Sequence, residues 1–134
     1  MISSLSDSLG LDAQSRIEKL HPFNKPSNTS VKVEYFPSIE KMADYPDTSH
    51  TDGGLLTMNS MEYWGFQIVL PWNKQWASVE PKSGYILVNV ANTLQSLTGN
   101  KLHSCAHRIT QIGDGIEKRL LAAYFLRPVL GNVC

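Results

Sequence analysis

The sequence lacks any apolar run of the roughly 18 residues that a membrane-spanning helix requires. It also lacks an excess of charge, because its twelve basic and twelve acidic residues cancel. Without a net positive field, nucleic acids and anionic membranes are poor candidates as partners. The first ten residues are rich in serine and do not show the basic and then apolar order of a signal peptide. We therefore expect a cytoplasmic protein that binds neither nucleic acid nor membranes.

Cysteine is scarce as well. The chain has two cysteines, Cys105 and Cys134, and neither belongs to a CxxC pair. A single disulfide is not expected in a chain without a secretion signal. We expect two free thiols, with Cys105 as a small core residue because it lies in an apolar stretch.

The composition is that of a folded domain. The chain has 134 residues, of which 42% are hydrophobic and 9% aromatic, enough for one modest core. Apolar residues between positions 5 and 20 recur at helical spacing, which predicts a helical adaptor over residues 1–30. From Val31 onward, short β-branched and aromatic runs are separated by Gly, Pro, Asn and Asp, which is typical of antiparallel β structure. The main domain, residues 31–134, should be all-β.

Eight short strands in two four-stranded sheets would account for this pattern of short apolar runs and turn-forming residues. Turn-forming residues at 52–54 and 113–115 favour tight reversals, and residues 93–97 are expected to form a turn of helix. The candidate strands are residues 31–36, 55–58, 65–70, 77–79, 85–90, 102–109 and 119–126, with two more at 45–50 and near Ala91.

The residues that could carry chemistry begin with His50-Thr51-Asp52. On a strand, residues i and i+2 project from the same face, so one metal ion could contact both His50 and Asp52. Two histidines and one carboxylate on one face of an octahedron suit a non-haem iron(II) that must also bind oxygen and a substrate. His107 is the best candidate for the second histidine, and His103 and His21 compete with it.

Five runs of sequence together resemble a known enzyme family. They read HTDGGLLTM from His50, GFQIV from Gly65, WASVEPKSGYILVNV from Trp76, LTGNKLHSCAHRI from Leu97 and RLLAAYFLRP from Arg119. In order and spacing they are similar to the C-terminal half of the isopenicillin N synthase-like iron(II)- and 2-oxoglutarate-dependent dioxygenases. The family pattern K-x-x-S-x-x-H-R falls on Lys101, Ser104, His107 and Arg108, so the resemblance selects His107 over His103.

The resemblance implies a double-stranded β-helix, or jelly-roll, with iron(II) held by His50, Asp52 and His107. It implies an oxidoreductase that uses O₂, and 2-oxoglutarate as co-substrate, to oxidise a small molecule of the secondary-metabolite type by hydroxylation, desaturation or cyclisation. In such a fold, alternating strand residues fill the interior before they recognise a ligand. The expected core residues are Leu55, Phe66, Ile68, Ile86, Val88 and Tyr124.

The co-substrate pocket departs from the family pattern. The family holds 2-oxoglutarate with an Arg-x-Ser triplet, and this chain has Arg119 followed two residues later by Leu121. Phe36 stands where the family has a tyrosine whose hydroxyl reaches the co-substrate. The resemblance thus implies a carboxylate anchor at Arg119 and a pocket near Phe36, Asn89 and Leu121 that lacks two hydroxyl groups. Use of 2-oxoglutarate is therefore a separate question from iron binding.

The chain also begins shortly before the first expected jelly-roll strand, whereas family members carry a long N-terminal region. We expect a homodimer or a partner subunit to cover the open jelly-roll. The rival hypothesis is a truncated, dioxygenase-like protein that is non-catalytic, or that catalyses a non-oxidative step, and that acts as a binding or partner subunit.

Overall fold

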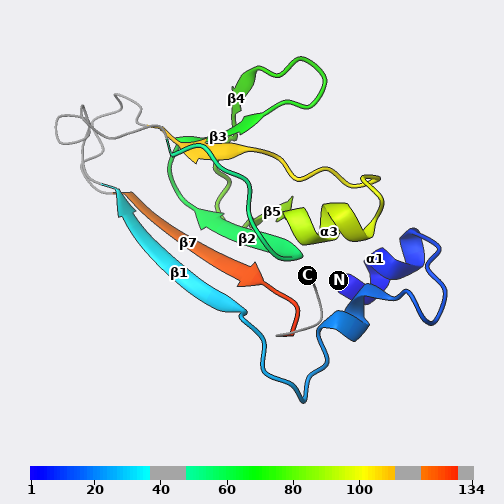
Figure 1. Ribbon diagram of the computed structural model, residues 1–134. Coiled ribbons are helices and arrows are strands. Elements are labelled where there is room, and N and C mark those ends of the chain that lie inside the picture. Colours follow the sequence, from blue (N-terminus) through cyan, green and yellow to red (C-terminus); the bar gives the residue numbers. More distant parts are fainter. Residues whose placement is uncertain (37–47, 111–118, 130–134) are drawn as a thin grey trace.

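A computed structural model describes residues 1–36, 48–110 and 119–129 of the chain. Two layers of antiparallel sheet face each other, and the helices lie together at one end (Figure 1). One sheet has the strand order β1-β7-β2-β5 and the other the order β4-β3-β6. The strand bounds are β1 Ser30–Phe36, β2 Leu56–Met61, β3 Phe66–Val69, β4 Trp76–Ser78, β5 Leu87–Val90, β6 His107–Ile109 and β7 Arg119–Leu126.

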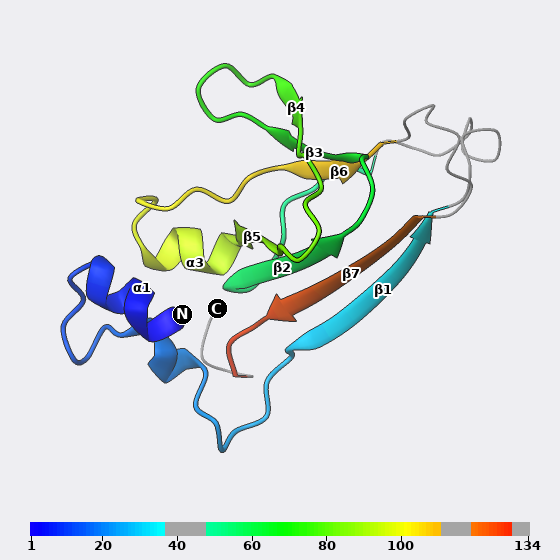
Figure 2. The same ribbon diagram turned by 180° about the vertical axis from the view of Figure 1, so that it is seen from behind.

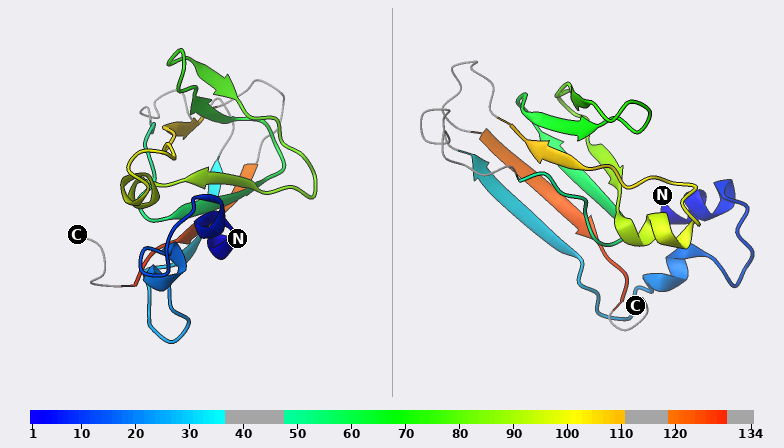
Figure 3. Two further views of the ribbon diagram at one scale, coloured as in Figure 1. Left: turned by 90° about the vertical axis from the view of Figure 1, so that its right-hand side faces the viewer. Right: turned by 45° about the horizontal axis from the view of Figure 1, so that its top comes forward.

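The all-β double-stranded β-helix expected from the sequence is confirmed. β7 has the expected bounds, and β1 pairs with it over the whole length of β1, so the two lie side by side as the longest strands (Figure 3). The described residues contain seven strands, in one four-stranded and one three-stranded sheet. The candidate strand at 45–50 falls mostly outside the described residues, as do the expected turn at 113–115 and Cys134. His50, the last residue of that candidate strand, forms an isolated antiparallel bridge with His107, the first residue of β6.

Two of the expected strands need correction. The prediction of a strand near Ala91 is wrong, because Ala91 immediately precedes the helix α3 (Asn92–Leu97). This helix matches the helical turn that the sequence predicts at residues 93–97. Of the strand expected at residues 102–109, only the last three residues form a strand, β6. Gly99 and Asn100 adopt positive φ angles of 58° and 63° and turn the chain after α3, so it rejoins the sheet only at His107.

The N-terminal segment forms two short helical pieces, α1 (Ile2–Ser8) and η1 (Ile17–Leu20). Ile17 is buried in one cluster with Leu55, Leu56, Leu94 and Leu126, so this segment covers the end of the sheet beside α3 (Figure 2). The helical character expected for residues 1–30 is therefore present in part. The division of the chain into an adaptor and a main domain at residue 30 stays a prediction.

Part of the expected core is exposed in the structure. Leu55 and Phe66 are buried as expected, and Ile68 is half-buried. Ile86, Val88 and Tyr124 are exposed. These three residues were assigned to the core because strand alternation shows which residues share a face, but not which face is covered.

In the part of the chain that the structure describes, no helix has both the length and the apolar character needed to cross a bilayer.

Candidate metal centre

The two histidines of the expected triad lie directly opposite each other on neighbouring extended segments. The backbone N–H of His50 donates to the carbonyl of His107 over 3.0 Å, and the N–H of His107 donates to the carbonyl of His50 over 2.9 Å. Residues that exchange both hydrogen bonds in an antiparallel pair point their side chains to the same face. The imidazole centroids are accordingly 4.5 Å apart.

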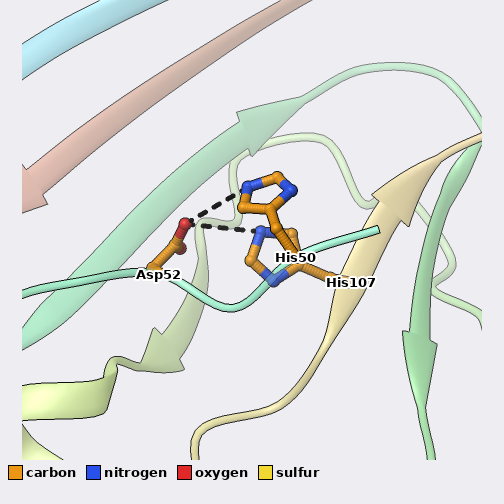
Figure 4. Close-up of side chains that lie close together, drawn as sticks. All are labelled: His50, Asp52 and His107. Atoms are coloured by element: carbon orange, nitrogen blue, oxygen red, sulfur yellow. Dashed lines mark ion pairs between the residues drawn. The ribbon is translucent and has the colours of Figure 1, made fainter. Parts of the chain in front are cut away.

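Asp52 completes a cluster of three metal-ligating side chains (Figure 4). Its Oδ1 atom lies 3.5 Å from Nε2 of His50 and 3.6 Å from Nε2 of His107. Donor atoms about 2.0–2.2 Å from one metal ion and at right angles to each other would be roughly 3 Å apart. The observed separations are close to that value. His50 and His107 come from two adjacent segments, and Asp52 lies two residues after His50. The donor atoms of these three side chains therefore converge on a single point.

Each imidazole ring is oriented by a hydrogen bond from its Nδ1 atom to a backbone carbonyl. The Nδ1 atom of His50 lies 2.7 Å from the carbonyl of Thr48, and Nδ1 of His107 lies 3.1 Å from the carbonyl of Cys105. A carbonyl can only accept, so each Nδ1 carries a proton, and Nε2 is the ring nitrogen that can coordinate a metal. Phe66 stacks on the ring of His107, with centroids 5.2 Å apart. His107 and Asp52 are buried, while the His50 side chain is 57% exposed and gives the site its open side.

The second oxygen of Asp52 is held by a chain of two amides. Nδ2 of Asn89 donates to Oδ2 of Asp52 over 2.9 Å, and Nδ2 of Asn59 donates to Oδ1 of Asn89 over 2.7 Å. Asn59 is buried on the inner face of β2. The carboxylate is thereby fixed with Oδ1 toward the two histidines. The sequence placed Asn89 near the iron, whereas Asn59 was missed, although it shares inward strand parity with buried Thr57.

The segment that follows Asp52 is fastened to α3 and to β7. The carbonyl of Asp52 accepts from the N–H of Asn92 over 2.8 Å, and the carbonyl of Gly54 accepts from Leu94 over 3.2 Å. Gly54 has φ +96°, and a Cβ there would lie 2.9 Å from the carbonyl oxygen of Leu126. Only glycine allows this close approach of the two backbones. The metal-ligating pair is thus tied to the hydrophobic core rather than to a free loop.

A cavity of about 370 Å³ opens beside the triad. Phe36 and Leu121 line it as expected, and so do Lys32 and Glu34, which the sequence had not assigned to the cavity. Arg119 is buried at the start of β7 and lines a smaller neighbouring pocket instead. The two pockets share four lining residues: Phe36, Phe66, Ile109 and Leu121.

The rival histidines lie elsewhere. His103 is exposed, and His21 lies 3.0 Å from the hydroxyl of Thr29; neither joins the cluster with Asp52. Cys105 is a free thiol whose Sγ donates to the carbonyl of Val69 over 2.9 Å. Burial raises the pKa of the Cys105 thiol above its ordinary value, which favours the neutral form expected of a packed cysteine.

Asn89→Leu should weaken metal binding, because Oδ2 of Asp52 would lose its donor and the carboxylate could rotate. Loss of a partner that orients a metal ligand costs about 10- to 100-fold in metal affinity. Equilibrium dialysis with Co(II) would measure this loss. The matched control is Asn73→Leu, since Asn73 is an exposed residue whose side chain hydrogen-bonds Gln75 within a turn. Unchanged Co(II) affinity in Asn89→Leu would contradict the role of Asn89.

Known proteins resemble this chain over most of its length. The family model described as the 2OG-Fe(II) oxygenase superfamily matches residues 27–128. The chain is 36% identical over 132 residues to the 2-oxoglutarate-dependent dioxygenase iboH of Amanita muscaria, covering 96% of this chain and 64% of that relative. It is 32% identical over 130 residues to the 2-oxoglutarate-dependent dioxygenase gloE of Glarea lozoyensis, covering 96% of this chain and 39% of that relative.

Among solved structures, a full-length protein of Neurospora crassa in complex with alpha-KG and thymine superposes with a TM-score of 0.78. The sequence identity is 20%, and the match covers 95% of this chain and 40% of that one. This likeness shows the fold. The chain spans less than two thirds of the length of each of these relatives.

Proposed function

This chain belongs to the 2OG-Fe(II) oxygenase superfamily, and from that premise we propose that it is a non-haem iron(II)-dependent oxygenase in which His50, Asp52 and His107 hold the metal. The observation that supports this proposal most strongly is the convergence of their three donor atoms within 4.8 Å of one another. Two neutral imidazoles and one carboxylate are the donor set that suits Fe(II) in oxygenases of this type. The residues present therefore fit the metal that the family uses.

The proposed reaction is oxidation of a small molecule with 2-oxoglutarate and O₂ as co-substrates. In a hydroxylation, 2-oxoglutarate, O₂ and a C–H bond of the substrate give succinate, CO₂ and a C–OH group. Bound Fe(II) supplies the redox chemistry for this exchange. The chain's own part is to hold the donors in place through Asn89, to orient both imidazoles through backbone carbonyls, and to seat the organic ligands in the cavity lined by Phe36, Leu121 and their neighbours.

A substrate of the secondary-metabolite type is also part of the proposal. It is supported by the similarity to dioxygenases of fungi, including iboH and gloE. Arg119 remains the carboxylate anchor that the family pattern suggests, and its burial beside the cavity is compatible with that role. The cytoplasmic location expected from the sequence stays a prediction.

Turnover of 2-oxoglutarate tests the proposed activity. Fe(II)-loaded protein, given 2-oxoglutarate and O₂, should release succinate faster than the metal-free protein does. Without its organic substrate the enzyme still needs an oxidisable partner, so ascorbate should be present as the reductant. If wild-type protein that binds Fe(II) and 2-oxoglutarate consumed O₂ no faster than Asp52→Ala, the rival hypothesis of a non-catalytic or non-oxidative subunit would be favoured.

We propose further that a second copy of the chain covers the exposed face of the four-stranded sheet. That face is built from Val31, Val33 and Tyr35 of β1, which are 66%, 66% and 54% exposed, together with Leu120 and Tyr124 of β7. An apolar patch continuous over two long strands favours an interface. Light scattering should give the mass of a dimer for the wild type and of a monomer for Val33→Lys. A monomeric wild type would contradict this part of the proposal.

A further inference from the structure

The two amides that hold Asp52 form a chain with a fixed direction. An ionised carboxylate only accepts hydrogen bonds, so Asn89 must turn its Nδ2 atom toward Oδ2 of Asp52, 2.9 Å away. Oδ1 of Asn89 is then left to accept from Nδ2 of Asn59, over 2.7 Å. This bond fixes the orientation of the second amide in turn. The carbonyl oxygen of Asn59, Oδ1, is therefore the end of the chain.

This oxygen is a hydrogen-bond acceptor that the protein itself does not use. No described residue donates a hydrogen bond to Oδ1 of Asn59, and the atom is not among the fully enclosed polar atoms that lack a partner. The residue as a whole is only 3% exposed, and it lines the metal cavity. The part of this buried side chain that remains accessible therefore borders the cavity.

The neighbouring strand leaves the amide accessible. Leu121, Ala123 and Phe125 of β7 all line the cavity, and the strand register places the smallest of them, Ala123, opposite Asn59. Side chains directly opposite each other on antiparallel strands have their Cβ atoms about 4.5–5.5 Å apart. A longer side chain at position 123 would cover the amide, whereas the methyl group of alanine leaves it open to a ligand.

The group that fits this oxygen is a hydrogen-bond donor. Both amides point their N–H groups toward the Asp52 carboxylate, so the negative end of the polarised chain lies at Oδ1 of Asn59. 2-Oxoglutarate carries two carboxylates and a ketone and has no donor at neutral pH. The donor must therefore come from the other organic molecule of the reaction, the substrate. A ligand without a donor would leave a largely buried acceptor unpaired, which lowers its affinity.

We propose that Asn59 determines substrate specificity, with its Oδ1 atom accepting a hydrogen bond from a hydroxyl or N–H group of the substrate. The inference rests on the proposed function, because it concerns the substrate of that same site. It assigns preference to molecules that carry such a donor over ketones, ethers and esters of the same shape. Since Asn59 is joined through Asn89 to Asp52, this contact places the donor group in a fixed relation to a metal ligand.

Cyclohexanol and cyclohexanone are suitable probes, because they share a ring and an oxygen acceptor, and only the alcohol donates. Binding of each to the Co(II)-loaded full chain is measured from the broadening of its NMR signals by the metal. The wild type should bind cyclohexanol about three- to tenfold more tightly than cyclohexanone, the effect of one neutral hydrogen bond. Asn59→Leu should lose this preference.

Thr57→Val is the matched control. Thr57 is the preceding inward residue of β2 and is 1% exposed; its hydroxyl has no partner, and it lies outside the cavity lining. This variant also replaces a buried polar group on β2 by an apolar one of similar size. It should retain the wild-type preference for the alcohol.

The ratio of the two affinities separates a direct contact from a general disturbance, because a displaced Asp52 or a distorted β2 would change both affinities together. Equal affinities in the wild type would overturn the proposal, and this result does not depend on the folding of any variant. A preference that persists in folded Asn59→Leu would place the acceptor elsewhere, for example at Glu34, and would overturn it as well. Co(II) loading is measured first: failure of the wild type to load would contradict the metal site, whereas normal loading keeps the two questions apart.

Discussion

His107→Ala is expected to lower the affinity for Fe(II) or Co(II) by more than about 100-fold, the upper end of what a lost orienting partner costs. His107 is the buried histidine of the triad, and its Nε2 lies 3.6 Å from Oδ1 of Asp52. Its removal would leave one carboxylate and the exposed His50. Equilibrium dialysis with Co(II), read by metal analysis of the protein, measures this loss directly.

The matched control for this experiment is His103→Ala. His103 is four positions away, is exposed, and competes with His107 on sequence grounds alone. It should leave the metal affinity unchanged. If the two variants bound Co(II) equally well, or if His103→Ala bound it more weakly, the assignment of His107 as a ligand would be wrong. A circular dichroism spectrum like that of the wild type shows that either variant is folded.

Leu94→Ala is expected to lower the free energy of unfolding by about 2–5 kcal/mol, the usual cost of truncating a fully buried leucine. Leu94 has no exposed surface and packs in the cluster with Ile17, Leu55 and Leu126. Its backbone N–H also donates to the carbonyl of Gly54, two residues after Asp52. Alanine keeps this N–H, but a helix that packs less tightly would hold Gly54 less firmly, so the substitution should weaken metal binding as well as stability, and urea unfolding with and without Co(II) measures both.

Leu97→Ala provides the comparison, because Leu97 ends the same helix and is 45% exposed. Its cost should stay within about 1 kcal/mol, as for surface substitutions away from a packed site. Equal losses in the two variants would mean that α3 is not anchored through Leu94. The connection between this helix and the metal-ligating segment would then be without support.

Much of the site could be predicted because it depends on local sequence. His50 and Asp52 are two residues apart on an extended segment, so their side chains share a face in any strand. The choice of His107 over His103 needed more than spacing, since both have the same strand parity. The pattern around Lys101, Ser104 and Arg108 supplied that choice, and the structure brings His107, rather than His103, to Asp52.

The two charged residues of β1 that line the cavity could not be predicted from alternation. In β1 the apolar residues Val31 and Val33 have the pattern of a buried face, yet they are exposed, while Lys32 and Glu34 line the cavity. Alternation separates two faces, and the position of the second sheet decides which of them is inside. That position depends on pairings between distant strands, which local patterns do not contain.

The same limit applies to Asn59. A buried asparagine in β2 has no visible partner in the sequence, because Asn89 lies thirty positions away and Asp52 belongs to another segment. Only the pairing of β2 with β5 brings the two amides together. Buried polar groups are nearly always hydrogen-bonded, so a polar residue at an inward strand position is the one signal that could have pointed to it.

Anaerobic titration of the wild-type chain with Fe(II), followed by metal analysis after removal of unbound ion, tests the central claim most directly. Binding should saturate at about one Fe(II) per chain, as one facial set of two histidines and a carboxylate requires, and Asp52→Ala should abolish this saturable binding. Wild-type protein that binds no Fe(II), or an Asp52→Ala variant that retains the wild-type stoichiometry and affinity, would contradict the assignment of His50, Asp52 and His107 as the metal centre.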